Sequence, residues 1–506
     1  MGYMKRISLF SRRSVRHHLA CVGILAVMSV PVIAMAQPVG IPSMGSTSSA
    51  ELSPALERTL GDAIMEQGRR DPAYVADLDV SQYLTDLGRK LAARAPAGTA
   101  QHISIFALRD PQINAFALPG GYIGVNTGLV VNATTEAELA SVVAHEIGHV
   151  SLRHIARGMT QQSQSSGIMI AALAGALLAA LSGSGDLAMG VAAFGQAAAV
   201  DRQLGFSRQA EQEADRAGFE MMRKAGFDPR GMIRMFNRLM DFSRLNEGMG
   251  GGAYTSTHPL SIQRMSDIEN RVRDTSTTGY RENPSFWYIR AKLQVMQAGA
   301  GQARRNAIQR LELDARQASG VRQSAAWYGL AYAALRANDL AQARAALDEA
   351  QKGGPDTPEL ASLAVTLALQ DQGAAEALPL ARAASNRWPE NQGVALTLIQ
   401  VMQKLGHDKD AVVYLEQRIK QWPDVPRLKQ LLAQSHERLG QPVEARRAMA
   451  SYYEQTGALP TAVEQLQQAR GMSRDFYIQS QIDVQIREIK QRLDSDRELL
   501  KRFKKS

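Results

Sequence analysis

The feature that most constrains the fold of this chain is a 34-residue period in its C-terminal half. Pro355, Pro389 and Pro423 lie 34 residues apart. The same spacing separates four alanines, Ala343, Ala377, Ala411 and Ala445. Between the prolines each unit contains two amphipathic patterns, so the chain should form pairs of helices that stack on their neighbours.

A 34-residue helix–turn–helix unit with small residues at fixed positions is typical of tetratricopeptide repeats. One predicted pair is Trp327 to Ala337 followed by Leu340 to Ala350. We expect residues 283–470 to form such an α-solenoid, with a concave face that binds protein segments. Residues 474–506 should form a charged helix with a basic end, more typical of a solvated cap than of a binding site.

The N-terminus has the three parts of a cleavable export signal. A basic region ends near Arg16, residues 19–33 are apolar, and Ala34-Met35-Ala36 offers a cleavage site. We expect residues 1–36 to be a signal peptide and 37–50, rich in Pro, Gly and Ser, to be a flexible leader. The single cysteine, Cys21, lies in the signal, so the mature chain would lack disulfides, a thiol nucleophile and thiolate ligands.

The charge balance gives little support to nucleic-acid binding. The formal net charge is +9, and it falls to +4 once the five basic residues of the signal are removed. The high isoelectric point is therefore partly a property of the targeting segment, and no nucleic-acid partner is expected.

The region 51–272 mixes helical patterns with one β-rich stretch. Residues 114–118 and 122–125 flank Pro119-Gly120-Gly121, which predicts a hairpin. Its edge could pair with an extended peptide substrate, or the hairpin could simply complete the sheet. Residues 168–200 form an apolar insertion of two arms, each too short to span a bilayer; they predict either two packed helices or a peripheral membrane contact.

The pentapeptide at 145–149, His-Glu-Ile-Gly-His, has the spacing of a metal site. On a helix, His145 and His149 share one face and can bind one ion, while Glu146 can accept a proton from a metal-bound water. Thr135 and Glu138 have the spacing of a capping box, which supports a helix here. Since the mature chain has no thiols, the remaining ligands must be histidines or carboxylates.

A second predicted helix, 207–224, supplies the missing ligand. Glu211 can complete a site of two histidines and one glutamate, which leaves a fourth position of a tetrahedral zinc open. Asp215, four residues on, is placed to accept the free N–H of a liganding imidazole. A three-histidine motif is excluded because Leu152 and Ile155 occupy its positions. His154 is expected to be either a surface residue or a residue that supports a ligand. Glu213 is expected to be solvated.

Four segments, in order, resemble a known family: NAFALPGGYIGVNTGL, HEIGHVSLRH, EQEADRAG and THPLSIQR. They are similar to the gluzincin metallopeptidases that include the HtpX-like and CAAX prenyl proteases. With an export signal and repeats, the chain most resembles the periplasmic BepA-type subgroup. The resemblance implies an α+β, mainly helical fold: a zinc metallopeptidase domain with a small β-sheet at 51–272, followed by the repeat solenoid. It also implies that His145, His149 and Glu211 bind one Zn²⁺, that Glu146 is the general base and that Asp215 supports a ligand.

The same resemblance identifies His258 and Arg264, which spacing alone does not. Either residue is a candidate donor to the oxyanion. Residues 248–252 contain four glycines, so the loop before His258 should be mobile. His258 is therefore expected either to ligate zinc in a resting state and swing away for catalysis, or to act as a static donor.

These features together predict an exported zinc metalloendopeptidase of the periplasm. The resemblance implies that it degrades unfolded or misassembled outer-membrane proteins and assists their assembly, with the repeats docking substrates or the β-barrel assembly complex. An alternative is a repeat-based chaperone or adaptor whose proteolytic site is secondary or latent. The intact Glu146 argues against a decayed site.

Overall fold

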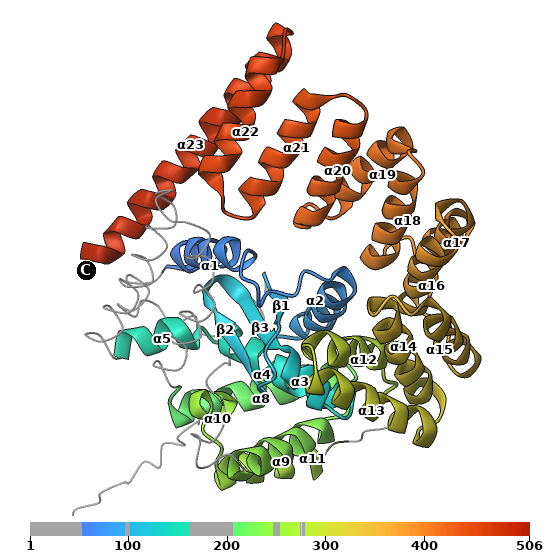
Figure 1. Cartoon of the computed structure of the whole chain (residues 1–506). Coiled ribbons are helices and arrows are strands. Elements are labelled where there is room, and N and C mark those ends of the chain that lie inside the picture. The colour runs from blue at the N-terminus through green and yellow to red at the C-terminus, as the bar shows by residue number, and fades with distance from the viewer. Residues whose placement is uncertain are drawn as a thin grey trace, which may run out of the picture. The chain divides into compact units, whose positions relative to one another are not determined.

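Helices dominate the fold, and one small sheet lies among them (Figure 1). The structure is a computed structural model that describes residues 53–96, 102–161, 206–245, 253–273, 275 and 279–505, and all of these belong to one unit of the chain. The predicted signal peptide, leader, apolar insertion and glycine-rich loop lie outside the described residues. Within the described part, no helix is both long enough and apolar enough to cross a membrane.

The sheet has three strands in the order β1-β3-β2. Strand β1 (Ser104–Leu108) pairs in parallel with β3 (Tyr122–Asn126), and β2 (Ala115–Leu118) pairs with β3 in antiparallel register. The predicted hairpin is therefore confirmed. Its turn uses a left-handed backbone at Gly120, where φ is +78°, a conformation that glycine adopts without steric cost.

Nine helices are described around this sheet in the N-terminal half. The predicted metal site depends mainly on the contact of α4 (Glu136–Ser151) with α8 (Arg208–Lys224). This contact is close because two glycines face the partner backbone. A Cβ at Gly148 would lie 2.9 Å from Ala214 O, and one at Gly218 would lie 3.1 Å from His145 N. The helices are α1 (Pro54–Gly68), α2 (Leu78–Ala92), α3 (Thr127–Asn132), α4 (Glu136–Ser151), α5 (His154–Gln161), α8 (Arg208–Lys224), α9 (Arg230–Leu245), α10 (Ala253–Thr257) and α11 (Ile262–Arg273).

Both site helices begin at side-chain caps, of which the sequence predicts the one at Thr135. Thr135 Oγ1 accepts a hydrogen bond from Glu138 N at 3.2 Å, and Ser207 Oγ accepts one from Ala210 N at 3.2 Å. The capping box differs in one respect, because the Glu138 carboxylate accepts from the backbone and hydroxyl of Thr134 rather than from Thr135 N. These caps satisfy backbone donors at the helix starts and fix where α4 and α8 begin.

The C-terminal half consists of paired helices, as the 34-residue period predicts. Its four periodic alanines are buried between helices, and Gly406 and Gly440 end equivalent helices with φ of +73° and +70°. The helices are α12 (Ser285–Gln297), α13 (Gln302–Gln317), α14 (Gly320–Arg336), α15 (Leu340–Gly353), α16 (Pro358–Asp371), α17 (Ala374–Arg387), α18 (Gln392–Lys404), α19 (Asp408–Gln421), α20 (Pro426–Arg438), α21 (Pro442–Gln455), α22 (Leu459–Met472) and α23 (Phe476–Lys505).

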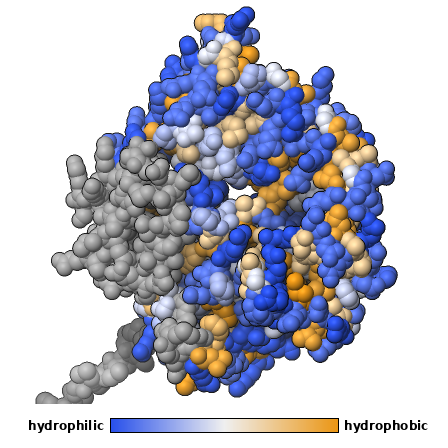
Figure 2. Space-filling view, viewed as in Figure 1, coloured by the Kyte–Doolittle hydropathy of each residue, from blue (hydrophilic) through white to orange (hydrophobic). Residues whose placement is uncertain are grey.

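The α+β, mainly helical fold class is thus confirmed. The face shown in Figure 2 is mainly hydrophilic, with scattered hydrophobic residues. The apolar stripes of the repeat helices face their partner helices, so stacked amphipathic pairs should expose mainly polar side chains, as this face does.

Candidate metal centre

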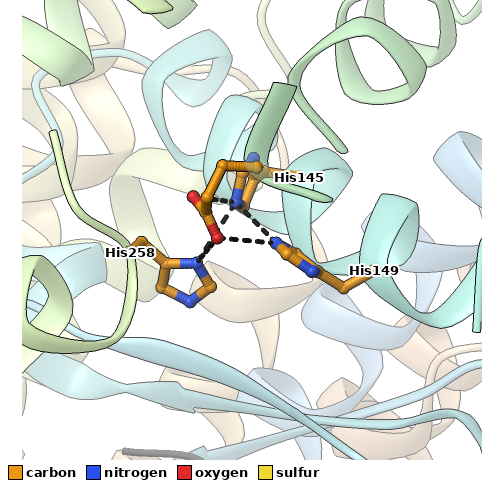
Figure 3. Close-up of side chains that lie close together, drawn as sticks. His145, His149 and His258 are labelled. Atoms are coloured by element: carbon orange, nitrogen blue, oxygen red, sulfur yellow. Dashed lines mark hydrogen bonds and ion pairs between the residues drawn. The ribbon is translucent and has the colours of Figure 1, made fainter. Parts of the chain in front are cut away.

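Four potential ligands from three parts of the chain meet at one buried point. Helix α4 carries His145 and His149, α8 carries Glu211, and His258 directly follows α10. One ligand atom from each lies within 4.8 Å of all the others, and all four residues are buried. Figure 3 shows the three imidazoles turned toward one another. The two histidines predicted to share a helix face therefore do so.

The distances within this cluster fit a bound cation. His145 Nε2 lies 2.9 Å from His149 Nε2 and 3.3 Å from His258 Nδ1, which is 3.0 Å from Glu211 Oε1. Two neutral ring nitrogens that face each other can share at most one proton, whereas a metal ion would accept the lone pair of each. Imidazole nitrogens and a carboxylate oxygen are ligands typical of zinc.

Two charged residues outside the cluster, Asp215 and Arg264, contact the potential ligands. Asp215 Oδ1 lies 2.9 Å from His145 Nδ1, as predicted. The guanidinium of Arg264 donates to both Asp215 oxygens at 2.7 and 2.8 Å, and its Nη1 lies 2.6 Å from Glu211 Oε2. Arg264 would have to give up these contacts to reach an oxyanion, so its position favours holding the two carboxylates rather than facing a substrate.

The electrostatics favour the metal-binding forms of His149, His258 and Glu211, but not of His145. Burial alone would lower the pKa of His145, but Asp215 and Glu211 raise it to about 10, so this imidazole must lose a proton when it binds metal. Burial lowers the pKa of both His149 and His258, which favours the neutral imidazole. Burial raises the pKa of Glu211, but His258, His145 and His149 outweigh it and hold this pKa far below the usual range. Burial likewise opposes ionisation of Asp215, yet Arg264 and His145 lower its pKa to about 2. Both carboxylates are thus ionised.

Glu146 lies beside the four clustered residues. It precedes Ile147 on α4, one position after the ligand His145, and is fully buried. Its Oε1 lies 3.5 Å from His258 Nε2. This places a carboxylate beside the cluster of potential ligands but outside it.

His154 lies in the second of its two expected places, beside a potential ligand, whereas the solvated position expected for Glu213 is wrong. His154, one residue out of the three-histidine register, is buried, and its Nδ1 lies 2.9 Å from His149 Nδ1. Glu213, expected to be solvated, is only partly exposed and contacts His154 Nε2 at 3.2 Å and Arg157 Nη1 at 2.7 Å. The break after α4 redirects His154, because Arg153 has a φ of +53° there. No sequence signal identifies this break, since an arginine does not by itself imply a left-handed backbone.

Comparison with known proteins agrees with this geometry. Residues 79–272 match the model of peptidase family M48, and residues 368–435 match a tetratricopeptide-repeat model. The chain is 29% identical to the Escherichia coli beta-barrel assembly-enhancing protease over 92% of both chains. A Vibrio cholerae relative is 35% identical over 54% of this chain and 56% of that protein. The E. coli metalloprotease LoiP is 30% identical over 44% of this chain and 82% of its own length.

Removing divalent metal from the protein with a chelator should lower its melting temperature. A ligand that binds only the folded state stabilises it by about 4 kcal/mol when its free concentration is a thousand times Kd. Scanning fluorimetry with and without chelator measures this shift, and added metal should reverse it. His149→Ala is the control, since its melting temperature should change little on chelation. Equal wild-type melting under both conditions would contradict a metal at this cluster.

Proposed function

The chain belongs to peptidase family M48 and is a metalloendopeptidase, and we propose that it is a zinc enzyme of the periplasm that degrades misassembled outer-membrane proteins and assists their assembly. The observation that carries the proposal is the buried cluster of His145, His149, Glu211 and His258 beside Glu146. Histidine and carboxylate ligands in a chain whose only cysteine lies near its N-terminus favour zinc over metals that prefer thiolates.

We assign His145, His149 and Glu211 as ligands of one Zn²⁺ per chain. When bound, zinc acts as a Lewis acid that makes water more acidic and stabilises negative charge on a carbonyl oxygen. Asp215 accepts from His145 Nδ1 and so directs His145 Nε2 into the cluster. Arg264 ties Asp215 to Glu211, so helix α8 holds one ligand and the support of another.

Glu146 is assigned as the general base and acid. It accepts a proton from the attacking water and passes it to the nitrogen of the leaving group. The peptide bond then breaks to release a neutral amine and not an amide anion. His258 is its neighbour at 3.5 Å and is positioned to donate to the oxyanion when it is not a ligand.

The substrate class is inferred from the relatives and the repeats. Relatives named beta-barrel assembly-enhancing protease share both parts of the chain, and tetratricopeptide repeats bind protein segments. We propose a signal peptide at 1–36, a leader at 37–50, the peptidase domain at 51–272, repeats at 283–470 and a terminal helix at 474–506. The repeats would dock unfolded outer-membrane proteins or the β-barrel assembly complex. Residues 168–200 would either pack against the peptidase domain or make a peripheral membrane contact.

Metal analysis combined with a cleavage assay tests this function. The mature protein should purify with one zinc per chain and should cleave an unfolded outer-membrane β-barrel protein faster than the same protein folded in detergent. An unfolded soluble protein of similar length is the comparison for substrate preference. A metal-free protein that stays inactive after zinc is added would refute the enzymatic part, and equal cleavage of all three substrates would refute the proposed selectivity.

His258 is proposed as a fourth ligand that blocks the water position in a resting state. Its Nδ1 lies 3.0 Å from Glu211 Oε1 and 3.3 Å from His145 Nε2, so it already sits among the ligands. His258→Ala should therefore raise basal proteolysis several-fold with zinc content unchanged. Initial rates on an unfolded protein measure this effect.

The opposite result separates the two roles of His258. If His258 is only an oxyanion donor, its loss should cost about 10²–10³-fold in kcat. Complete inactivity of His258→Ala with full zinc occupancy would thus contradict the resting-state ligand. Tyr254→Phe is a suitable control, because it keeps the ring that stacks on His258 at 4.6 Å while removing the hydroxyl.

A further inference from the structure

A second imidazole lies behind one of the proposed metal ligands. Helix α4 ends at Ser151, Arg153 adopts a left-handed φ of +53°, and α5 starts at His154. This break turns His154 back toward α4, where only 2% of its surface is exposed. Its Nδ1 lies 2.9 Å from His149 Nδ1. An uninterrupted helix would point residue 154 away from residue 149, because five residues turn it by about 140°.

The roles of the ring nitrogens follow from the direction of His149. Its Nε2 faces the cluster, 2.9 Å from His145 Nε2 and 3.4 Å from Glu211 Oε1. A neutral imidazole that gives its Nε2 lone pair to a cation carries its proton on Nδ1. His149 Nδ1–H must then donate to His154 Nδ1, which therefore has no proton. His154 in turn carries its proton on Nε2.

An acceptor-only group fixes the far end of this hydrogen-bond chain. His154 Nε2 lies 3.2 Å from Glu213 Oε2, and an ionised carboxylate can only accept. Glu213 is held in turn by Arg157 Nη1 at 2.7 Å and Gln209 Nε2 at 2.9 Å. On its other side, the ring of His149 stacks on Phe206 with centroids 3.9 Å apart. The ring is thus fixed by a hydrogen bond at its edge and by a contact across its face.

We propose that His154, backed by Glu213, is a positioning residue that fixes the proton and the orientation of His149 and so tightens metal binding. The inference rests on the proposed metal site. It gives the two ligands of α4 different supports: His145 is backed by Asp215 directly, whereas His149 is backed by a carboxylate acting through an intervening imidazole. Neither His154 nor Glu213 belongs to the cluster of four potential ligands, and both act through His149, so their effect should be on the affinity for metal.

Two substitutions of nearly equal size at residue 154 test the proposal. The Asn side chain places an acceptor oxygen where His154 has Nδ1, whereas the Leu side chain has none. His154→Leu should bind Zn²⁺ about 10–100-fold more weakly, as is usual when a partner of a metal-bound histidine is lost. His154→Asn should stay within about three-fold of wild type. Affinity is measured by competition with a chromophoric chelator, and the absorption spectrum of the Co²⁺ form reports the ligand geometry.

The controls separate the possible failures. His407→Leu, at an exposed residue of the repeats, should bind zinc as wild type does, and circular dichroism should show equal helix content in every variant. Equal affinities of His154→Leu and wild type would overturn the proposal. So would equal weakening by Asn and Leu, since the ring volume rather than the acceptor would then matter. Failure of the metal site itself would appear as a wild type without measurable zinc affinity.

Discussion

Glu146→Gln should abolish peptide-bond cleavage while leaving the zinc content unchanged. The substitution keeps the size of the side chain but removes the carboxylate that accepts the proton from water. A positioned general base contributes about 10²–10⁴-fold, and this one serves both the attack and the departure of the amine, so we expect the upper end of the range. Glu146 is outside the ligand cluster, so zinc should remain bound. Initial rates and metal analysis on the same sample measure both quantities.

Glu220→Gln is a matched control on helix α8, because Glu220 is a surface residue paired with Arg223. It should keep both activity and zinc. Retention of more than a tenth of wild-type activity by Glu146→Gln would show that another group takes the proton. The same variant tests the adaptor alternative in cells: if Glu146→Gln restores outer-membrane assembly as well as wild type does, the repeats account for that role and proteolysis is secondary.

The local parts of the metal centre could be predicted because they follow helix geometry. His145 and His149 are one turn apart, and Glu211 and Asp215 repeat that spacing on α8. His258 was found only through family resemblance, since no helical period links it to the cluster. For His154 a surface role and a supporting role both stayed open, because the left-handed φ of Arg153 is not implied by its residue type.

The same is true of the fold. Features set by nearby residues could be predicted from the sequence, whereas contacts between distant segments could not. The 34-residue period predicts the paired helices, because each repeat determines its own helices and packs on its neighbours. It does not predict how the repeats contact the N-terminal half. Helix α2 meets the start of α18, where Gln82 accepts from Gln392 N at 2.7 Å and donates to Glu390 O at 3.0 Å. These partners are more than 300 residues apart in sequence, beyond the reach of any periodic pattern.

A buried ion cluster joins α2 to α12 close to this contact. Lys292→Met should destabilise the fold by about 3–5 kcal/mol, which is the usual loss when one member of a buried pair is removed. Lys292 Nζ on α12 lies 2.7 Å from both Asp77 Oδ2 and Asp79 Oδ2. Burial alone would lower the pKa of Lys292, but the two aspartates raise it, so the ammonium stays charged. Without it, the buried Asp79 carboxylate would lie beside the partly exposed Asp77 carboxylate with no cation between them.

A double substitution distinguishes lost charge compensation from lost packing. Replacing a buried ion pair by apolar residues of similar size is often neutral, so Lys292→Met combined with Asp79→Leu should recover much of the loss. The midpoint of urea unfolding measures each variant. Lys352→Met, which breaks an exposed pair with Glu349, should leave the midpoint close to that of wild type, because solvent screens exposed ion pairs. Gly393→Ala adds an independent check, since its Cβ would lie 1.7 Å from Asp79 Oδ1 and should displace this carboxylate from Lys292. If Lys292→Met unfolds at the wild-type midpoint, the cluster does not hold α2 against the repeats, and the hydrogen bonds of Gln82 must account for that contact.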